Sequence, residues 1–98
     1  MHKIIIENIK TLCIAYNIKS LYVFGSVCTE NFDDNSDIDL LVSFKPMEYG
    51  DYAENYFILC EKFEKLFNRK VDLITDKSLS NPYFIYSINK TKTVLYEW

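Results

Sequence analysis

Three aspartates in this sequence stand within or beside expected strands, at a spacing that could do metal chemistry. Asp37 and Asp39 open the apolar run DIDLLVSF, and Asp72 lies inside KVDLIT. Residues two apart in a strand point the same way, roughly 7 Å apart, so the first two carboxylates share one surface. Clustered carboxylates repel unless a cation joins them, and hard oxygen ligands suit Mg²⁺ or Mn²⁺. We therefore predict a divalent metal site at Asp37, Asp39 and Asp72.

A Gly-Ser pair, Gly25 and Ser26, follows the short apolar run SLYVF and precedes the first aspartates. Glycine lets the backbone turn sharply and approach a ligand closely. Backbone N–H groups of such a turn, together with a serine hydroxyl, can hold phosphate oxygens. Metals held by carboxylates can activate an attacking oxygen and stabilise a leaving pyrophosphate. A phosphate-binding turn that faces a carboxylate strand predicts a nucleotidyl transfer site.

These residues must be positioned by helices and strands, which the hydrophobic periodicity predicts. Helices are expected over residues 2–17, in the aromatic stretch after Asp51, and at SNPYFIYSIN. Strands are expected at SLYVF, DIDLLVSF, KVDLIT and TVLYEW. This order predicts one α/β (α+β) domain over residues 1–98, with a mixed sheet of about four strands and flanking helices.

Several local signals predict where these elements begin, end and pair. Asp51 is a candidate N-cap with Glu54 at the capping-box position, and Asn81 is the candidate cap of the last helix. Asn68 is expected to end the long helix in a left-handed conformation. The loop over residues 27–36 is too short for a parallel crossover, so the strands on either side are expected to pair antiparallel. The last strand is expected at an edge of the sheet.

The spacing of these residues resembles the signature of a known family. Gly25-Ser26, ten further residues and then Asp37-x-Asp39 resemble the polymerase-β-like nucleotidyltransferases, and LYVFGS…SDIDLLVSF resembles their minimal members, the MNT-type proteins. KVDLIT resembles the strand that carries the family's third carboxylate. NPYFIYSINKTKTVLYE resembles the closing helix and strand, so the resemblance covers nearly the whole chain.

The resemblance implies a role for each site residue and a partner for the chain. Gly25 and Ser26 would hold the nucleotide phosphates, and Asp37 and Asp39 would bind metal. Asp72 would be the third carboxylate and would accept the proton of the attacking hydroxyl. Many minimal members are partners of HEPN-domain toxins, which are RNases. The family therefore implies transfer of AMP from ATP to a tyrosine of such a toxin, which silences it.

A departure from the family pattern keeps a second function open. Members often have Gly-Ser-x-Ala-Arg-Gly, whereas Thr29 and Glu30 stand here in place of the Arg and the Gly. A cation that could meet the triphosphate is missing at that point. The alternative is a non-catalytic antitoxin that neutralises its toxin by covering it. Transfer to a small molecule is a weaker alternative, because such enzymes generally need a second domain for the acceptor.

The composition is that of a globular domain without a basic surface. Of 98 residues, 49% are hydrophobic and 26% are charged, and the formal net charge is -3. Direct nucleic-acid binding is not expected, because a binder needs cations to displace phosphate counterions. The N-terminus lacks the unbroken apolar segment of a signal peptide, and no stretch is long enough to cross a membrane. A cytoplasmic protein is therefore expected.

Cysteine and aromatic residues carry the remaining expectations. Three cysteines without a CxxC spacing argue against a disulfide framework or a zinc site. Cys13 and Cys60 fit the apolar faces of helices, where core packing is expected. Eight Tyr and seven Phe are many for a small core. We therefore expect an apolar surface patch that serves a partner or self-association, in a hetero-oligomer or a homo-oligomer.

Overall fold

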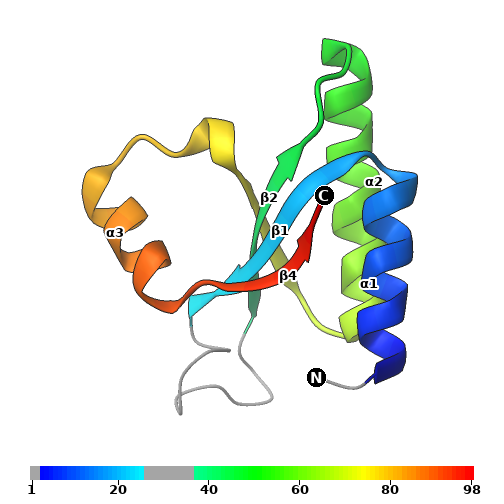
Figure 1. Cartoon of the computed structure of the whole chain (residues 1–98), viewed down its shortest axis with the longest axis horizontal. Coiled ribbons are helices and arrows are strands. Elements are labelled where there is room, and N and C mark those ends of the chain that lie inside the picture. Colours follow the sequence, from blue (N-terminus) through cyan, green and yellow to red (C-terminus); the bar gives the residue numbers. More distant parts are fainter. Residues whose placement is uncertain (1–2, 26–36) are drawn as a thin grey trace.

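A mixed sheet with helices on both faces forms the part of the chain that this computed structural model describes, residues 3–25 and 37–98 (Figure 1). The predicted α/β fold class is thereby confirmed. Within the described residues the sheet has four strands in the order β3-β2-β1-β4. The elements along the chain are α1 (Lys3–Ala15), β1 (Ile18–Phe24), β2 (Ile38–Phe44), α2 (Tyr49–Phe67), β3 (Val71–Thr75), the short 3-10 helix η2 (Asp76–Ser78), α3 (Pro82–Thr91) and β4 (Thr93–Glu97).

The strand pairing aligns residues from three strands on one face of the sheet. β1 pairs antiparallel with both β2 and β4, and β2 pairs parallel with β3. The antiparallel pairing of β1 with β2 and the edge position of β4 confirm two predictions. Phe24 stands opposite Asp39, and Asp39 in turn stands opposite Asp72. Because directly paired residues point to the same face, Phe24, Asp39 and Asp72 form a row across the sheet.

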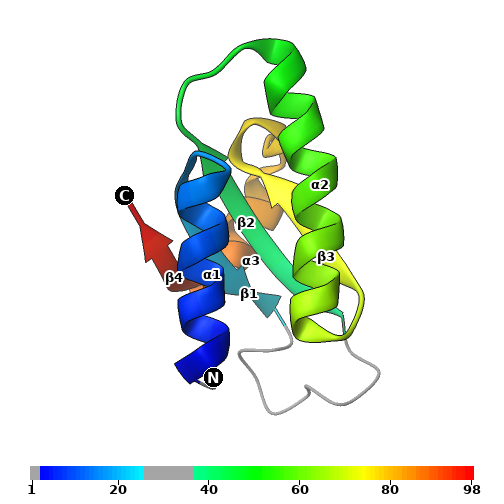
Figure 2. The same ribbon diagram turned by 90° about the vertical axis from the view of Figure 1, so that its right-hand side faces the viewer.

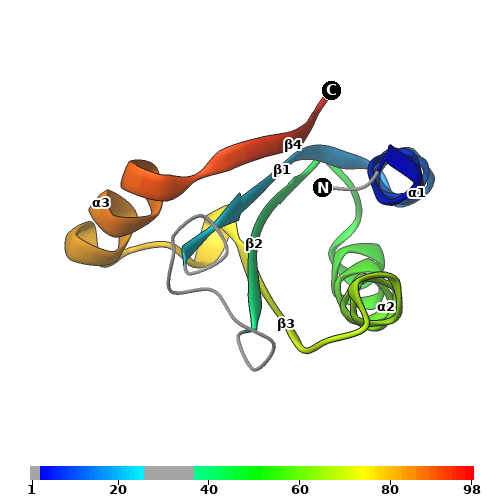
Figure 3. The same ribbon diagram turned by 90° about the horizontal axis from the view of Figure 1, so that it is seen from below.

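Helices α1 and α2 lie side by side over the other face, as Figures 2 and 3 show. Residues that alternate along β2 point toward these helices, as the period-two pattern predicts. Cys13 of α1 is fully buried there, and burial raises the pKa of its thiol to about 12. The main core joins the sheet to both helices and includes Ile9, Cys13, Leu21, Ile38, Leu40, Val42, Leu59 and Phe63.

Helix α3 lies on the face opposite α1 and α2 (Figure 3), and the strand register places Asp39 and Asp72 on this face. Its Ile88 is buried in a smaller cluster with Phe24 and Leu41. Leu41 is therefore buried although it shares a face with Asp39, because α3 covers the middle of that face. Only Asp39 and Ser43 of β2 are half-exposed, one on each side of the cluster.

Two of the predicted helix signals are confirmed. Asn68 ends α2 in the left-handed conformation, with φ of 55°. The side chain of Asn81 accepts hydrogen bonds from the backbone N–H groups of Tyr83 and Phe84 at the start of α3. These caps satisfy backbone groups that the helix ends would otherwise leave unpaired.

The predicted N-cap of α2 is wrong. The helix begins at Tyr49, and Glu48 occupies the N-cap position without a side-chain hydrogen bond. Asp51 lies instead in the first turn, where its charge still favours the positive end of the helix dipole. Glu54 therefore cannot complete a capping box. The sequence pattern therefore locates the start of α2 only to within a turn.

Side chains close the outer edge of strand β3. The backbone N–H of Val71 donates to Glu64 Oε2 at 3.2 Å, and the Tyr56 hydroxyl donates to the carbonyl of Leu73 at 2.6 Å. At the end of the strand, Ser78 Oγ donates to the carbonyl of Thr75 at 2.8 Å. Three backbone groups that could otherwise pair with another strand are thus already hydrogen-bonded. None of the described helices is both long and apolar enough to cross a membrane.

Candidate active site

The parallel pairing of β2 with β3 sets Asp39 directly beside Asp72. Asp39 is half-buried, whereas Asp72 is exposed. Burial raises the pKa of Asp39, and repulsion by Asp72, a hydrogen bond with Asp72 and repulsion by Asp37 raise it further. All four causes raise this pKa, because burial and two neighbouring carboxylates each disfavour the charged form. A proton or a bound cation relieves this repulsion.

Gly25 approaches the Asp39 carboxylate so closely that no side chain fits between them. It follows β1 directly and has a left-handed φ of 77°. A Cβ atom placed on Gly25 would lie 2.5 Å from Oδ2 of Asp39. Both the backbone conformation and the lack of space require glycine here. The predicted phosphate-binding turn therefore begins in contact with a predicted metal ligand.

Thr91 is a contact of this turn that sequence reasoning missed. Its Oγ1 accepts a hydrogen bond from the backbone N–H of Gly25 at 3.0 Å. The two residues are 66 positions apart, and Thr91 ends a helix that the sequence pattern relates only to the core. No local signal could have indicated the contact, because it depends on how α3 returns to the end of β1.

The predicted site residues are brought together in part. Asp72 and Gly25 each lie beside Asp39, and Asp37 lies just before β2, half-buried and close enough to repel Asp39. Ser26 lies outside the described residues, as do Thr29, Glu30 and Cys28.

The donor set fits a hard divalent cation in its chemistry. Its ligand atoms are carboxylate oxygens, and Asp72 and Asp37 both repel the Asp39 carboxylate, a repulsion that a cation would relieve. In the stretches that the structure describes, no group of three or more His, Cys, Asp or Glu side chains is arranged to hold a metal ion. The described geometry thus brings one close pair together, Asp39 with Asp72. The metal-binding trio stays a prediction.

Comparison with known proteins agrees with this arrangement. A family model described as polymerase beta, nucleotidyltransferase, matches residues 7–98. The chain belongs to the polymerase-β-like nucleotidyltransferase family. The resemblance read from Gly25, Ser26, Asp37 and Asp39 is therefore confirmed at the level of the family and of its fold.

The chain is also similar to individual members of this family. A protein of Methanocaldococcus jannaschii, named as a candidate protein adenylyltransferase, is 42% identical over 81 residues, which cover 83% of this chain and 80% of the relative. A solved structure described as a candidate minimal nucleotidyltransferase has a TM-score of 0.71 at 27% identity and covers 90% of this chain and 86% of that chain.

A further solved structure shares the fold at lower identity. It is described as a tri-AMPylated Shewanella oneidensis HEPN toxin in complex with MNT antitoxin. The match has a TM-score of 0.65 at 19% identity and covers 100% of this chain and 74% of that chain. The sheet and helices that position Asp39 and Asp72 are thus those of a minimal nucleotidyltransferase.

Proposed function

We propose that this chain transfers AMP from ATP, in the presence of Mg²⁺ or Mn²⁺, to a tyrosine of a HEPN-domain toxin and so inactivates that RNase. The observation that carries the proposal is that Asp39 stands directly opposite Asp72 and has Gly25 against its carboxylate. Concentrated negative charge next to a tight backbone turn is what a metal-bound triphosphate needs. The proposal treats residues 1–98 as one nucleotidyltransferase domain.

The transfer would divide the work among the site residues. Asp37, Asp39 and Asp72 would hold the metal, which when bound neutralises the phosphates and the leaving pyrophosphate. Gly25 and Ser26 would orient the phosphate chain against Asp39. Asp72 is exposed at the edge strand, so an incoming hydroxyl can reach it and hand over its proton. An oxygen–phosphorus bond forms at the acceptor tyrosine while the bond to pyrophosphate breaks.

Two similar proteins support a protein acceptor and a HEPN-domain partner. The relative from Methanocaldococcus jannaschii is named for transfer to protein, and the Shewanella oneidensis complex holds an AMPylated HEPN toxin with an MNT antitoxin. A toxin that cleaves RNA also agrees with a cytoplasmic pair. Four aromatic side chains are more than half exposed, as expected for a chain that binds a protein partner: Phe57, Tyr83, Tyr86 and Trp98.

A binding antitoxin without catalysis is the second candidate. It is favoured by Thr29 and Glu30, which take the places of the family's Arg and Gly. This candidate uses the same fold and the same partner but does not need the carboxylates. Mutation of the carboxylates therefore separates the two functions.

The experiment combines the purified chain with its cognate toxin, ATP and Mg²⁺ and weighs the toxin by mass spectrometry. One or more AMP units are expected on the toxin. Asp37→Asn and Asp39→Asn are each expected to lower transfer by at least about 10–100-fold, the loss typical of a disturbed metal site. Asp51→Asn, an exposed substitution in the first turn of α2, is the matched control and should transfer normally.

Toxin activity is measured in the same samples. Neutralisation is expected to fall in step with transfer in Asp37→Asn and Asp39→Asn. If both variants neutralise the toxin fully while no AMP appears on it, the enzymatic proposal is wrong and the binding antitoxin is correct.

A further inference from the structure

The hydrogen bond between Thr91 and Gly25 joins two distant parts of the fold at the candidate active site. Thr91 is the last residue of α3, and Figure 1 shows the junction of α3 with β4 beside the end of β1. Thr91 Oγ1 accepts from the Gly25 N–H at 3.0 Å in a partly buried position. Gly25 in turn lies against the Asp39 carboxylate. Gly25 thus links Thr91 to the Asp39 carboxylate.

Gly25 needs an anchor because strand pairing does not reach it. The last described pair between β1 and β2 joins Phe24 to Asp39, and the pairing of β1 with β4 reaches Val23. Gly25 lies beyond both ladders, at a φ of 77°. Glycine has more backbone freedom to lose than any other residue, so an unanchored glycine would sample other conformations. In the described part of the chain, the bond to Thr91 is the contact that restrains its N–H.

Thr91 is suited to this task because its own backbone is fixed on both sides. Ile88, one turn earlier, is 2% exposed and packs in the cluster with Phe24. The N–H of Lys92 donates to the carbonyl of Ile88 at 2.8 Å and closes the last turn of the helix. Thr93, two residues after Thr91, pairs with Val23 of β1. The hydroxyl is therefore presented from a rigid junction.

We infer that Thr91 is a positioning residue for nucleotide binding: it holds the Gly25 N–H and so keeps Gly25 against the Asp39 carboxylate. This inference rests on the proposed function, because it takes the turn at Gly25 to bind the phosphates of ATP. Thr91 acts through Gly25 and makes no contact with the reacting atoms in this role.

Two substitutions separate the hydroxyl from the shape of the side chain. Thr91→Val keeps the branched shape and removes the acceptor, whereas Thr91→Ser keeps the acceptor. Thr11→Val is the matched control, since the Thr11 hydroxyl donates to the carbonyl of Glu7 on α1, on the other side of the sheet. The dissociation constant of ATP with Mg²⁺, measured by calorimetry, is expected to rise about three- to tenfold in Thr91→Val, as for the loss of one hydrogen bond. Thr91→Ser and Thr11→Val are expected to bind like the wild type.

A spectroscopic measurement reports on the hydrogen bond without ATP. The chain has only two glycines, Gly25 and Gly50, so glycine labelled with the heavy nitrogen isotope gives two backbone amide signals. In Thr91→Val the Gly25 amide proton is expected to move upfield and to exchange faster with solvent. Gly50 lies in the first turn of α2 and serves as an internal control with an unchanged signal. Thr91→Ser should restore the Gly25 signal, which a merely structural loss would not predict.

The outcomes distinguish this inference from the proposed function. Wild-type protein that binds no ATP overturns the proposed function, and the positioning role with it. Wild-type binding that Thr91→Val leaves unchanged overturns the positioning role alone, as does an unmoved Gly25 signal. If Thr91→Val lowers the melting temperature by several degrees, Thr91→Ala is used in its place. Its ATP dissociation constant and its Gly25 amide signal are then compared with those of Thr91→Ser, with the same expected differences.

Discussion

Asp39 and Asp72 stand opposite each other in the parallel pairing of β2 with β3, and Asp39 carries the electrostatic consequence. Burial and the repulsion of Asp72 are the first causes that raise its pKa above the ordinary value for aspartate. A group with a higher pKa in the folded state binds its proton more tightly when folded, so ionising it opposes folding. Such an arrangement is typical of a functional site that is maintained at a cost in stability.

The first prediction concerns the stability of the metal-free protein. The contribution of Asp39 to stability is fully present below the pKa of unfolded aspartate and is lost as the pH rises through the raised pKa of the folded protein. Asp39→Asn cannot ionise, so it is expected to reduce this loss and to leave the melting temperature at neutral pH unchanged or higher. Urea unfolding in EDTA, from below the ordinary pKa of aspartate up to neutral pH, measures the loss of stability. Thermal unfolding in EDTA at neutral pH measures the melting temperature.

Asp51→Asn is the control for that series, because Asp51 is exposed on α2, away from the pairing of β2 with β3. A clear drop in the melting temperature of metal-free Asp39→Asn would show that the carboxylate stabilises the fold instead.

The second prediction compares the two glycines. Gly25→Ala places a methyl group against Asp39 Oδ2 at a left-handed φ and is expected to destabilise the fold by about 1–3 kcal/mol. Gly50→Ala meets nothing within 4 Å and lies in a helix, so it is expected to stabilise by up to about 1 kcal/mol. Urea unfolding of both variants measures the difference. Equal effects in the two variants would show that Gly25 is not tightly held.

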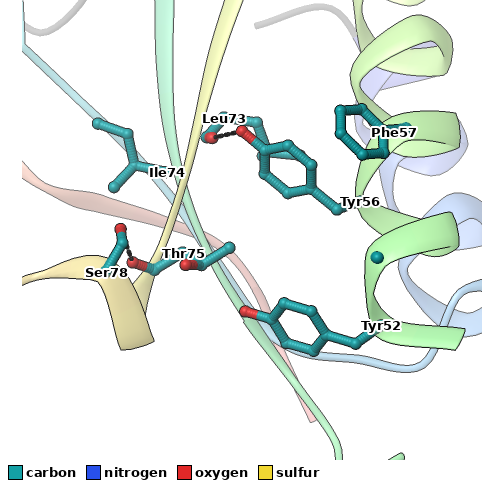
Figure 4. A pocket seen from close by; sticks show the side chains of 8 residues that line it. Tyr52, Tyr56, Phe57, Leu73, Ile74, Thr75 and Ser78 are labelled. Atoms are coloured by element: carbon teal, nitrogen blue, oxygen red, sulfur yellow. Dashed lines mark hydrogen bonds between the residues drawn. The ribbon is translucent and has the colours of Figure 1, made fainter. Parts of the chain in front are cut away.

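The third prediction concerns two tyrosines of α2 that line one cavity of about 490 Å³ (Figure 4). The Tyr56 hydroxyl donates to the carbonyl of Leu73 at 2.6 Å. The buried Tyr52 hydroxyl has no hydrogen-bond partner among the residues that the structure describes. Tyr56→Phe is expected to destabilise by about 1 kcal/mol, whereas Tyr52→Phe is expected to be neutral or stabilising, because it removes an unpaired polar atom. Thermal unfolding of the pair tests this, and a larger loss for Tyr52→Phe would contradict it.

The fourth prediction is that nucleotide binding depends on a divalent metal. The wild type is expected to bind ATP measurably by calorimetry with Mg²⁺ or Mn²⁺ and poorly in EDTA, because the carboxylates of Asp39 and Asp72 repel a free triphosphate. Equal ATP affinity with and without metal would count against a role for these carboxylates as metal ligands.

The sequence predicted those parts of the fold that depend on local patterns. The alternation along DIDLLVSF indicated which residues of β2 face α1 and α2, and Asn68 and Asn81 indicated helix ends through their own side-chain and backbone preferences. The short connection between β1 and β2 required an antiparallel pair. Each of these follows from a few neighbouring residues.

Features that depend on packing between distant segments could not be predicted in this way. The alignment of Asp39 with Asp72 is a matter of register between strands, and strand identity alone does not determine register. Leu41 lies on the same face of the sheet as Asp39, but it is buried because Ile88 of α3 covers it. The contact of Thr91 with Gly25 likewise depends on how α3 packs against the sheet, which local sequence patterns do not determine.

The last prediction assigns the proton-accepting role to Asp72. Its side chain is exposed on the edge strand β3, whereas its partner Asp39 is half-buried, so Asp72 is the carboxylate that an acceptor hydroxyl can reach. Asp72→Asn is expected to slow AMP transfer by roughly 100-fold or more, the usual contribution of a general base, while the dissociation constant of ATP with Mg²⁺ rises by a clearly smaller factor. Single-turnover transfer and calorimetry on the same samples measure the two quantities, with Asp51→Asn as the control. If binding and transfer fall by the same factor, Asp72 serves only as a metal ligand, and if neither changes, Asp72 does not belong to the site.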